Sequence, residues 1–164
     1  MTARGSLILI VALAGFLGAD SRAGDPPRKP DSEQDLLGRL AREQNPVKKA
    51  KYEIRLARVK LLQATDTFEK GDLNGTQKLL EAYLARLKDA WNTLQASGRP
   101  AHNKPQGFRE LDIELREDQR YLEDMTRRFP FTDRGSVERI AREAEQLRNE
   151  VLKALFPPEP QKNH

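Results

Sequence analysis

Residues 46–75 read PVKKAKYEIRLARVKLLQATDTFEKGDLNG, and this stretch decides the fold. Its apolar positions alternate at steps of three and four residues: Val47, Ala50, Ile54, Ala57, Leu61, Ala64 and Phe68. Such a ridge, kept over about three heptads, is typical of a helix that packs on another helix. Asn45 can cap this helix with Pro46 at its first position, and Gly71 supplies the left-handed residue that ends it. Gly71 to Gly75 then predicts a tight reversal.

Similar ridges recur along the rest of the chain. A short helix after Asp31 or Ser32 carries Leu36, Leu37 and Leu40. The later ridges are Leu80, Tyr83, Leu87, Ala90 and Leu94; Phe108, Leu111, Leu115, Leu122, Met125 and Phe129; and, after a cap at Asp133, Val137, Ile140, Ala144, Leu147, Val151 and Ala154. We therefore predict an all-α fold, an antiparallel helical bundle of two hairpins with four long helices and a short N-terminal helix. Two hairpins stacked side by side, as in a helical repeat, are the alternative.

The first 23 residues predict a signal peptide. Arg4 precedes an apolar run from Leu7 to Ala19, which is too short to cross a bilayer as a helix. Small residues before Gly24 suit cleavage after Ala23, and Ala19 is a second candidate. An uncleaved membrane anchor is the alternative, and membrane contact is expected through this segment only. Residues 24–31 are then a disordered spacer, 32–156 the helical bundle domain and 157–164 a disordered tail.

The composition excludes several classes of protein. The chain has no Cys and two His, so disulfides, thiolate chemistry and a His-based metal centre are excluded. It contains no phosphate-binding loop, hydrolase elbow or zinc-protease motif. We expect no enzyme activity and no cofactor. The net charge of +4 is too small to predict a nucleic-acid partner.

Charged residues predict a contact between two helices. Asp118 interrupts the apolar ridge of residues 108–129, and Glu110 and Glu114 precede it on the same flank. A basic stripe lies beside the ridge of residues 46–70 and consists of Lys48, Lys51, Arg55 and Arg58. We predict that this stripe faces the acidic flank and fixes the order of the helices by charge complementarity. The alternatives are that Asp118 reaches water or helps to bind a cation or ligand, and that the stripe binds an anionic surface such as lipid headgroups or a polymer.

The segment 97–107 is the best place for a functional contact, because loops tolerate exposed polar groups on a rigid scaffold. Its candidate residues are Arg99, His102 and Lys104. An exported protein without disulfides fits a bacterial periplasm or the cell exterior. We therefore predict a secreted, non-enzymatic binding or structural module of the cell envelope with an unidentified protein partner. A coiled-coil homo-oligomer is a further alternative. The alternative is a small exported protein that binds a ligand or cation, or an enzyme, using the acidic flank.

Residues 64–72, ATDTFEKGD, followed by Leu79 and Leu80, resemble the turn between the helices of a tetratricopeptide repeat. That family places a small residue, an aromatic residue and Gly-Asp at such a hairpin, so the resemblance implies a helical hairpin over residues 64–84. Thr76 stands where the family has alanine, and no second copy follows at a spacing of about 34 residues. As a whole the chain is similar to exported, all-helical bacterial families of undefined role. Neither resemblance carries a catalytic residue onto this sequence.

Overall fold

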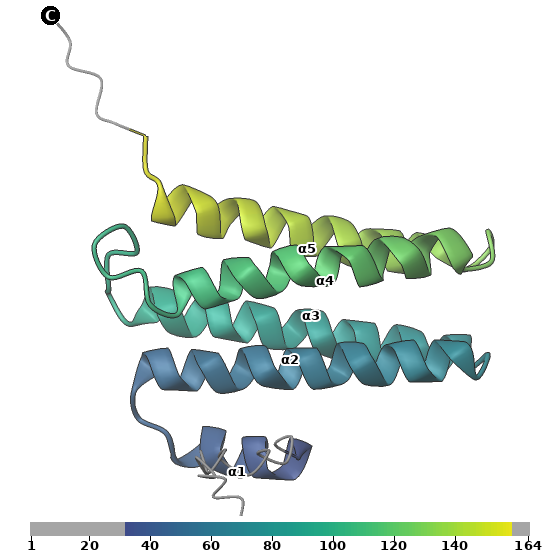
Figure 1. The fold of residues 1–164 in the computed structure, drawn as a ribbon, viewed down its shortest axis with the longest axis horizontal. Coiled ribbons are helices and arrows are strands. Elements are labelled where there is room, and N and C mark those ends of the chain that lie inside the picture. The colour runs from purple at the N-terminus through teal and green to yellow at the C-terminus, as the bar shows by residue number, and fades with distance from the viewer. Residues whose placement is uncertain (1–31, 159–164) are drawn as a thin grey trace, which may run out of the picture. The chain divides into compact units, whose positions relative to one another are not determined.

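The computed structural model describes residues 32–158, and this part of the chain contains five α-helices (Figure 1). They are α1 (Glu33–Arg42), α2 (Pro46–Glu69), α3 (Leu73–Ala96), α4 (Phe108–Arg128) and α5 (Arg134–Leu155). The predicted all-α fold is confirmed. The predicted signal peptide of residues 1–23, the spacer of residues 24–31 and residues 159–164 of the predicted tail lie outside the described residues.

Side-chain caps set the beginnings of α1, α2 and α3. Ser32, Asn45 and Asp72 each accept a backbone N–H group from the first turn of the helix that follows. Pro46 stands at the first position of α2, where its missing N–H group costs no intrahelical hydrogen bond. The prediction of Asn45 as the cap of this helix is confirmed.

The reversal between α2 and α3 is shorter than predicted. Gly71 has a φ of +80°, so it does adopt the left-handed conformation expected of it. Leu73 is already helical, however, and Asn74 and Gly75 belong to the first turn of α3. The physical reason is the Asp72 cap, whose carboxylate accepts the Gly75 N–H at 2.8 Å and allows the helix to begin before the Asn-Gly pair.

The ridges of α2 and α3 form the core of the first hairpin. The predicted α2 ridge is buried from Val47 to Ala64, and Phe68 at its end is half-buried. All five residues of the predicted α3 ridge are fully buried, and Leu84 and Trp91 widen it. Burial of this apolar surface is the main source of stability, at roughly 25 cal/mol per Å².

The second hairpin consists of α4 and α5 and has its own ridge on each helix. Every predicted ridge position of α4 is buried, Asp118 included, and the α5 ridge is buried from Val137 to Val151. The turn between the helices is held by Arg134, whose guanidinium donates to the carbonyl oxygens of Arg127 and Phe129. These carbonyls end α4 and lack intrahelical partners, so the arginine acts as a C-terminal cap.

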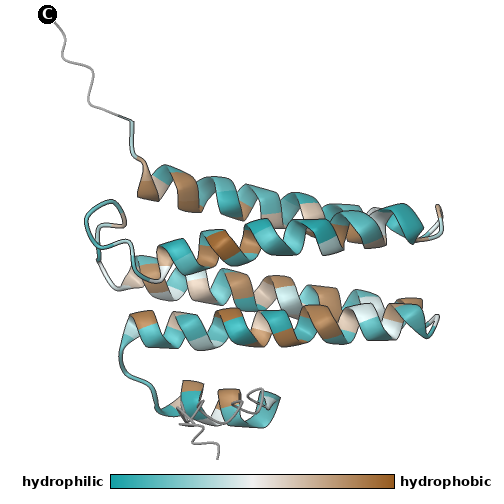
Figure 2. Cartoon of the chain, viewed as in Figure 1, coloured by the Kyte–Doolittle hydropathy of each residue, from teal (hydrophilic) through white to brown (hydrophobic). Residues whose placement is uncertain are grey.

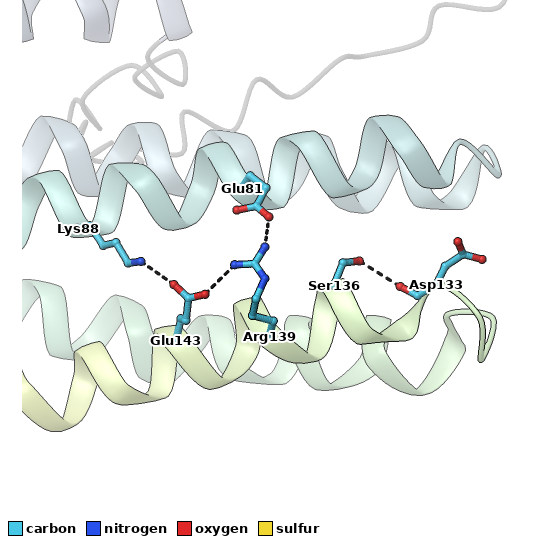
Figure 3. Close-up of polar contacts among 6 residues, drawn as sticks. All are labelled: Glu81, Lys88, Asp133, Ser136, Arg139 and Glu143. Atoms are coloured by element: carbon cyan, nitrogen blue, oxygen red, sulfur yellow. Dashed lines mark hydrogen bonds and ion pairs between the residues drawn. The ribbon is translucent and has the colours of Figure 1, made fainter.

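The prediction that Asp133 caps α5 with its side chain is wrong. Asp133 does occupy the residue before the helix, but its carboxylate accepts the Thr132 hydroxyl at 2.8 Å and makes no hydrogen bond to the helix. Its backbone carbonyl instead accepts the Ser136 hydroxyl at 3.0 Å (Figure 3). The backbone conformation of Asp133 is already helical, which turns its side chain away from the N–H groups of the first turn.

The two hairpins stack with equivalent helices against one another. α2 packs on α3 and α4, and α5 packs on α4 and α3, while α1 packs on α2. α2 and α4 run in one direction and α3 and α5 in the other (Figure 1), so the connection from α3 to α4 crosses the diagonal of the four helices. Hydrophobic residues recur at intervals along each helix between hydrophilic ones (Figure 2). The predicted bundle of two hairpins is confirmed.

Gly107 ends the diagonal connection and touches both hairpins. It is buried with a φ of +88° directly before α4. A Cβ atom at this position would lie 2.5 Å from Leu94 Cδ2 and 3.5 Å from Val47 Cγ1. Its N–H group donates to Glu110 Oε2 at 2.5 Å, which closes the beginning of α4. Glycine is therefore required here both by the backbone conformation and by the available space.

We expect Gly107→Ala to lower the free energy of unfolding by about 2–4 kcal/mol, because it combines a strained positive φ with overpacking against Leu94. Gly71→Ala is the matched control. Gly71 has a similar φ but no atom within 4 Å of the added Cβ, so its cost is limited to about 1–2 kcal/mol. Urea unfolding followed by circular dichroism measures both, and equal losses would show that Leu94 yields at no cost.

Candidate functional site

The groove between α2 and α4 contains a row of ion pairs, which we call the charged seam. Lys51 Nζ lies 2.7 Å from Glu110 Oε1 near the start of both helices. Arg58, two turns later, pairs with Asp118, and its Nη1 lies 3.8 Å from Glu114 Oε1. At the far end Arg128 Nη1 lies 2.7 Å from Glu69 Oε1. Because the helices are parallel, these pairs share one register along the groove.

The charged seam brings together half of the candidate residues that the sequence singled out. Lys51 and Arg58 face Glu110, Glu114 and Asp118, as the spacing of the basic stripe and the acidic flank predicted. Arg55 lies on α2 between these two cations, and Lys48 is exposed at the beginning of the helix. The loop residues lie elsewhere: Arg99 is half-buried, and His102 and Lys104 are exposed in the connection from α3 to α4.

Asp118 is the buried centre of the seam. Its side chain is fully buried, whereas Arg58 keeps 32% of its side chain exposed and Glu114 keeps 18%. The Arg58 guanidinium also lies over the Tyr121 ring, with Cζ 5.1 Å from the centroid. Arg58 is thus held between a buried carboxylate and an aromatic face, two arrangements that suit the planar guanidinium better than an ammonium group.

Tyr83 of α3, the other helix of the first hairpin, also reaches this buried centre. Its side chain is fully buried, and its hydroxyl faces the Asp118 carboxylate closely enough to affect its protonation, without reaching hydrogen-bond geometry. Among the described residues no hydrogen-bond partner is found for Tyr83 Oη, Asp118 Oδ2 or Glu114 Oε1, all three of which are buried. Unsatisfied buried polar atoms carry a desolvation cost and are rare in native proteins.

Burial changes the protonation of this cluster. Desolvation raises the pKa of Glu114 to about 7, and the neighbouring Asp118 charge adds to the effect while Arg58 opposes it. Desolvation likewise raises the pKa of Asp118 to about 6 in spite of its contact with Arg58. The pKa of Tyr83 is raised well above its usual range by burial and by Asp118. The two carboxylates can therefore take up protons near neutral pH, which ordinary surface carboxylates do not.

A second polar network joins the hairpins on the side of α3 and α5 (Figure 3). Glu143 of α5 accepts from Lys88 Nζ of α3 at 2.6 Å and from Arg139 Nη1 at 2.6 Å. Arg139 also pairs with Glu81 of α3. Glu81, Lys88 and Arg139 are exposed and Glu143 is half-exposed, so water and salt screen each pair and it adds little to stability. This network aligns α3 with α5 but carries no buried charge.

Sequence reasoning missed the polar role of Tyr83, which it assigned to an apolar ridge. It also missed the pair between Glu53, which is only 5% exposed, and Arg86, whose Nη1 lies 3.0 Å from Glu53 Oε2. Both signals are present in the sequence: a hydroxyl within a ridge, and a carboxylate between Ala50 and Ile54 of the α2 ridge. Neither indicates which partner helix supplies the contact, because that depends on how the helices pack against one another.

Three further findings concern metal sites, membrane-spanning helices and similarity to known proteins. No group of three or more His, Asp or Glu side chains in residues 32–158 is arranged to hold a metal ion. None of the helices in the same range has both the length and the apolar character needed to cross a membrane. No protein-family model, curated protein or solved structure matches the chain.

We expect Arg58→Met to lower the free energy of unfolding at pH 8 by about 2–3 kcal/mol, because it leaves the buried Asp118 carboxylate without a cation. Lys51→Met is the matched control in the same groove. Its ion pair with Glu110 is exposed, so the loss stays below about 1 kcal/mol. At pH 5 the cost of Arg58→Met falls, because Asp118 protonates. Equal losses in both variants at pH 8 would contradict a buried centre.

We expect Glu114→Gln to make stability less dependent on pH. The folded pKa of Glu114 is about 7 against 4.5 for an ordinary glutamate, so the native state binds more protons in this range and its stability falls as pH rises from 4.5 to 7. The variant should therefore be at least about 1 kcal/mol more stable than the parent at pH 8, with a smaller difference at pH 5. Thermal unfolding at both pH values measures this, with the exposed Glu145→Gln as control. A parallel shift at both values would contradict it.

Proposed function

We propose that the chain is an exported, non-enzymatic helical module that serves as a binding or structural part of the bacterial cell envelope. The observation that carries the proposal is the engagement of the acidic flank. Lys51 and Arg58 neutralise Glu110 and Asp118 across the α2–α4 groove, so the side chains with the best potential for chemistry are used to hold two hairpins together. Asp118 is fully buried, and a general base must come within hydrogen-bond reach of the proton that it takes from a substrate.

Export is supported by the sequence before α1. The apolar run from Leu7 to Ala19, the positive residue before it and the small residues up to Ala23 have the order of a signal peptide. The lack of cysteine suits a bacterial envelope better than a small eukaryotic secreted domain, which is usually stabilised by disulfides. A bundle stabilised by apolar ridges and ion pairs does not need such cross-links.

A second candidate function is the binding of a small ligand or cation at the acidic flank. The specific observation in its favour is the group of buried atoms without hydrogen-bond partners among the described residues, Tyr83 Oη, Glu114 Oε1 and Asp118 Oδ2. A bound cation or donor would satisfy them. A ligand of this kind would raise the melting temperature of the parent and not that of Glu114→Gln, which separates this function from the main proposal.

We expect the chain, expressed in full in a Gram-negative host, to appear in the periplasm with a new N-terminus at Gly24 or Asp20. Fractionation followed by N-terminal mass spectrometry measures this. Replacing both Ala19 and Ala23 by Lys is the control, because it removes the small residues and should leave the leader attached. Parent protein that keeps Met1 and stays in the cytoplasm would overturn the proposal of export.

The module part of the proposal is tested by crosslinking in the native envelope followed by affinity capture. A defined partner protein, or a mass equal to a multiple of one chain, supports a binding or structural role. Turnover of a small molecule by the purified chain, lost in Glu114→Gln, would replace the module by an enzyme.

A further inference from the structure

The end of the bundle at which α2 and α4 begin carries a set of exposed cations, which we call the basic end. Four segments meet there: the first turns of α2 and α4, the last turn of α5 and the connection from α3 to α4 (Figure 1). Its cations are Lys48, Lys49, Lys104, Arg109 and Lys153, all of them exposed. The segments are tied together by the pair of Lys51 with Glu110 and by Gly107, which lies against Leu94 and Val47.

None of these five cations has a carboxylate partner among the described residues. Along the length of the helices, several arginines and lysines pair across or within the hairpins, as Arg128 does with Glu69 and Arg148 with Asp112. At the basic end Glu110 is already bound to Lys51 and to the Gly107 N–H, and Glu43 accepts the Asn45 N–H. The positive charge of this end is therefore not neutralised within the fold.

The opposite end of the bundle shows no such excess. Its two turns and the adjoining helix ends, residues 64–76 and 124–136, contain the cations Lys70, Arg127, Arg128 and Arg134 and the carboxylates Asp66, Glu69, Asp72, Asp124 and Asp133. At the basic end, residues 43–51, 97–110 and 150–156 add Lys51 and Arg99 to the five exposed cations, against the carboxylates Glu43, Glu110 and Glu150. The chain thus presents one basic end and one nearly neutral end.

An exposed aromatic ring accompanies the cations. Phe156 ends α5 three residues after Lys153, and 69% of its surface is exposed. Lysine and arginine attract anionic headgroups, with about a fivefold gain in partitioning for each residue near the surface. Phe is among the apolar residues that bury their side chains at the boundary between headgroups and acyl chains. A soluble anionic polymer would use the cations but would gain little from the ring.

We propose that the basic end docks the bundle onto a membrane surface rich in anionic lipid headgroups, with Lys48, Lys49 and Lys104 as electrostatic contacts and Phe156 as an interfacial anchor. The contact is peripheral and reversible, and it places the helix axes roughly perpendicular to the membrane surface. The neutral end then points away from the membrane. The proposal deepens the function proposed above and rests on it for placing the chain beside a membrane.

The test is cosedimentation of the full chain with vesicles of phosphatidylcholine alone and with vesicles that contain phosphatidylglycerol. The leader, which carries Arg4 and Arg22, is common to the parent and to every variant, so the measured quantity is the ratio of the two partition coefficients and its change from parent to variant. We expect this ratio to exceed about ten for the parent at low salt and to fall towards one at high salt, as screening requires. A parent ratio of one at low salt overturns the proposal.

Matched variants locate the contact. Lys48→Gln, Lys49→Gln and Lys104→Gln together should lower the ratio at least tenfold. The control replaces Lys78, Arg116 and Arg120 by Gln, which removes the same charge from exposed positions outside the basic end and should change the ratio less than about twofold. Circular dichroism verifies that both variants keep the helix content of the parent. Equal losses in the two variants would overturn the assignment to the basic end.

Phe156→Ser separates a lipid surface from an anionic polymer. We expect it to weaken binding to the anionic vesicles several-fold and to leave binding to soluble polyphosphate unchanged. A variant that binds the vesicles as well as the parent does would overturn the lipid surface in favour of a polymer. The vesicle assay does not depend on export, so its failure with correct processing at Gly24 or Asp20 overturns this inference alone.

Discussion

Burial of Asp118 within the ridge of α4 is the constraint on which the packing of the two hairpins depends. A charged carboxylate at the centre of an apolar ridge can be buried only where a cation lies at the same level of the facing helix. Arg58 of α2 provides this cation. Because α2 and α4 run parallel, this one level sets the register of the whole groove. Lys51 then meets Glu110 at one end, and Arg128 meets Glu69 at the other.

Ion pairs between elements engage charged side chains along the helices, whereas one end of the bundle keeps an excess of cations. Glutamates and arginines at the middle of the helices are used between elements, for example Glu53 with Arg86 and Asp112 with Arg148. At the basic end, where helices terminate, the facing carboxylate of Glu110 is taken up by Lys51, and the other cations stay exposed. The internal ion pairs align the helices, and the excess positive charge at the basic end remains exposed to solvent.

The helices and their apolar ridges could be predicted from the sequence because they depend on local spacing, and the Asn45 cap and the left-handed Gly71 followed from local chemistry. The spacing also indicated that the basic stripe faces the acidic flank. The earlier start of α3 at Leu73 and the loss of the Asp133 cap depend on competing hydrogen bonds of single side chains. The approach of Tyr83 to Asp118 depends on the order in which the hairpins stack, which a periodic pattern does not contain.

A double-mutant cycle tests the central role of the buried pair most directly. The free energies of unfolding of the parent, Arg58→Met, Asp118→Asn and the combined variant are measured by urea titration at pH 8. If the pair fixes the register of the hairpins, the two substitutions couple by at least about 1.5 kcal/mol, because each removes the same contact. Substitutions that add within about 0.5 kcal/mol would show that Arg58 and Asp118 act independently, and the register would then have another origin.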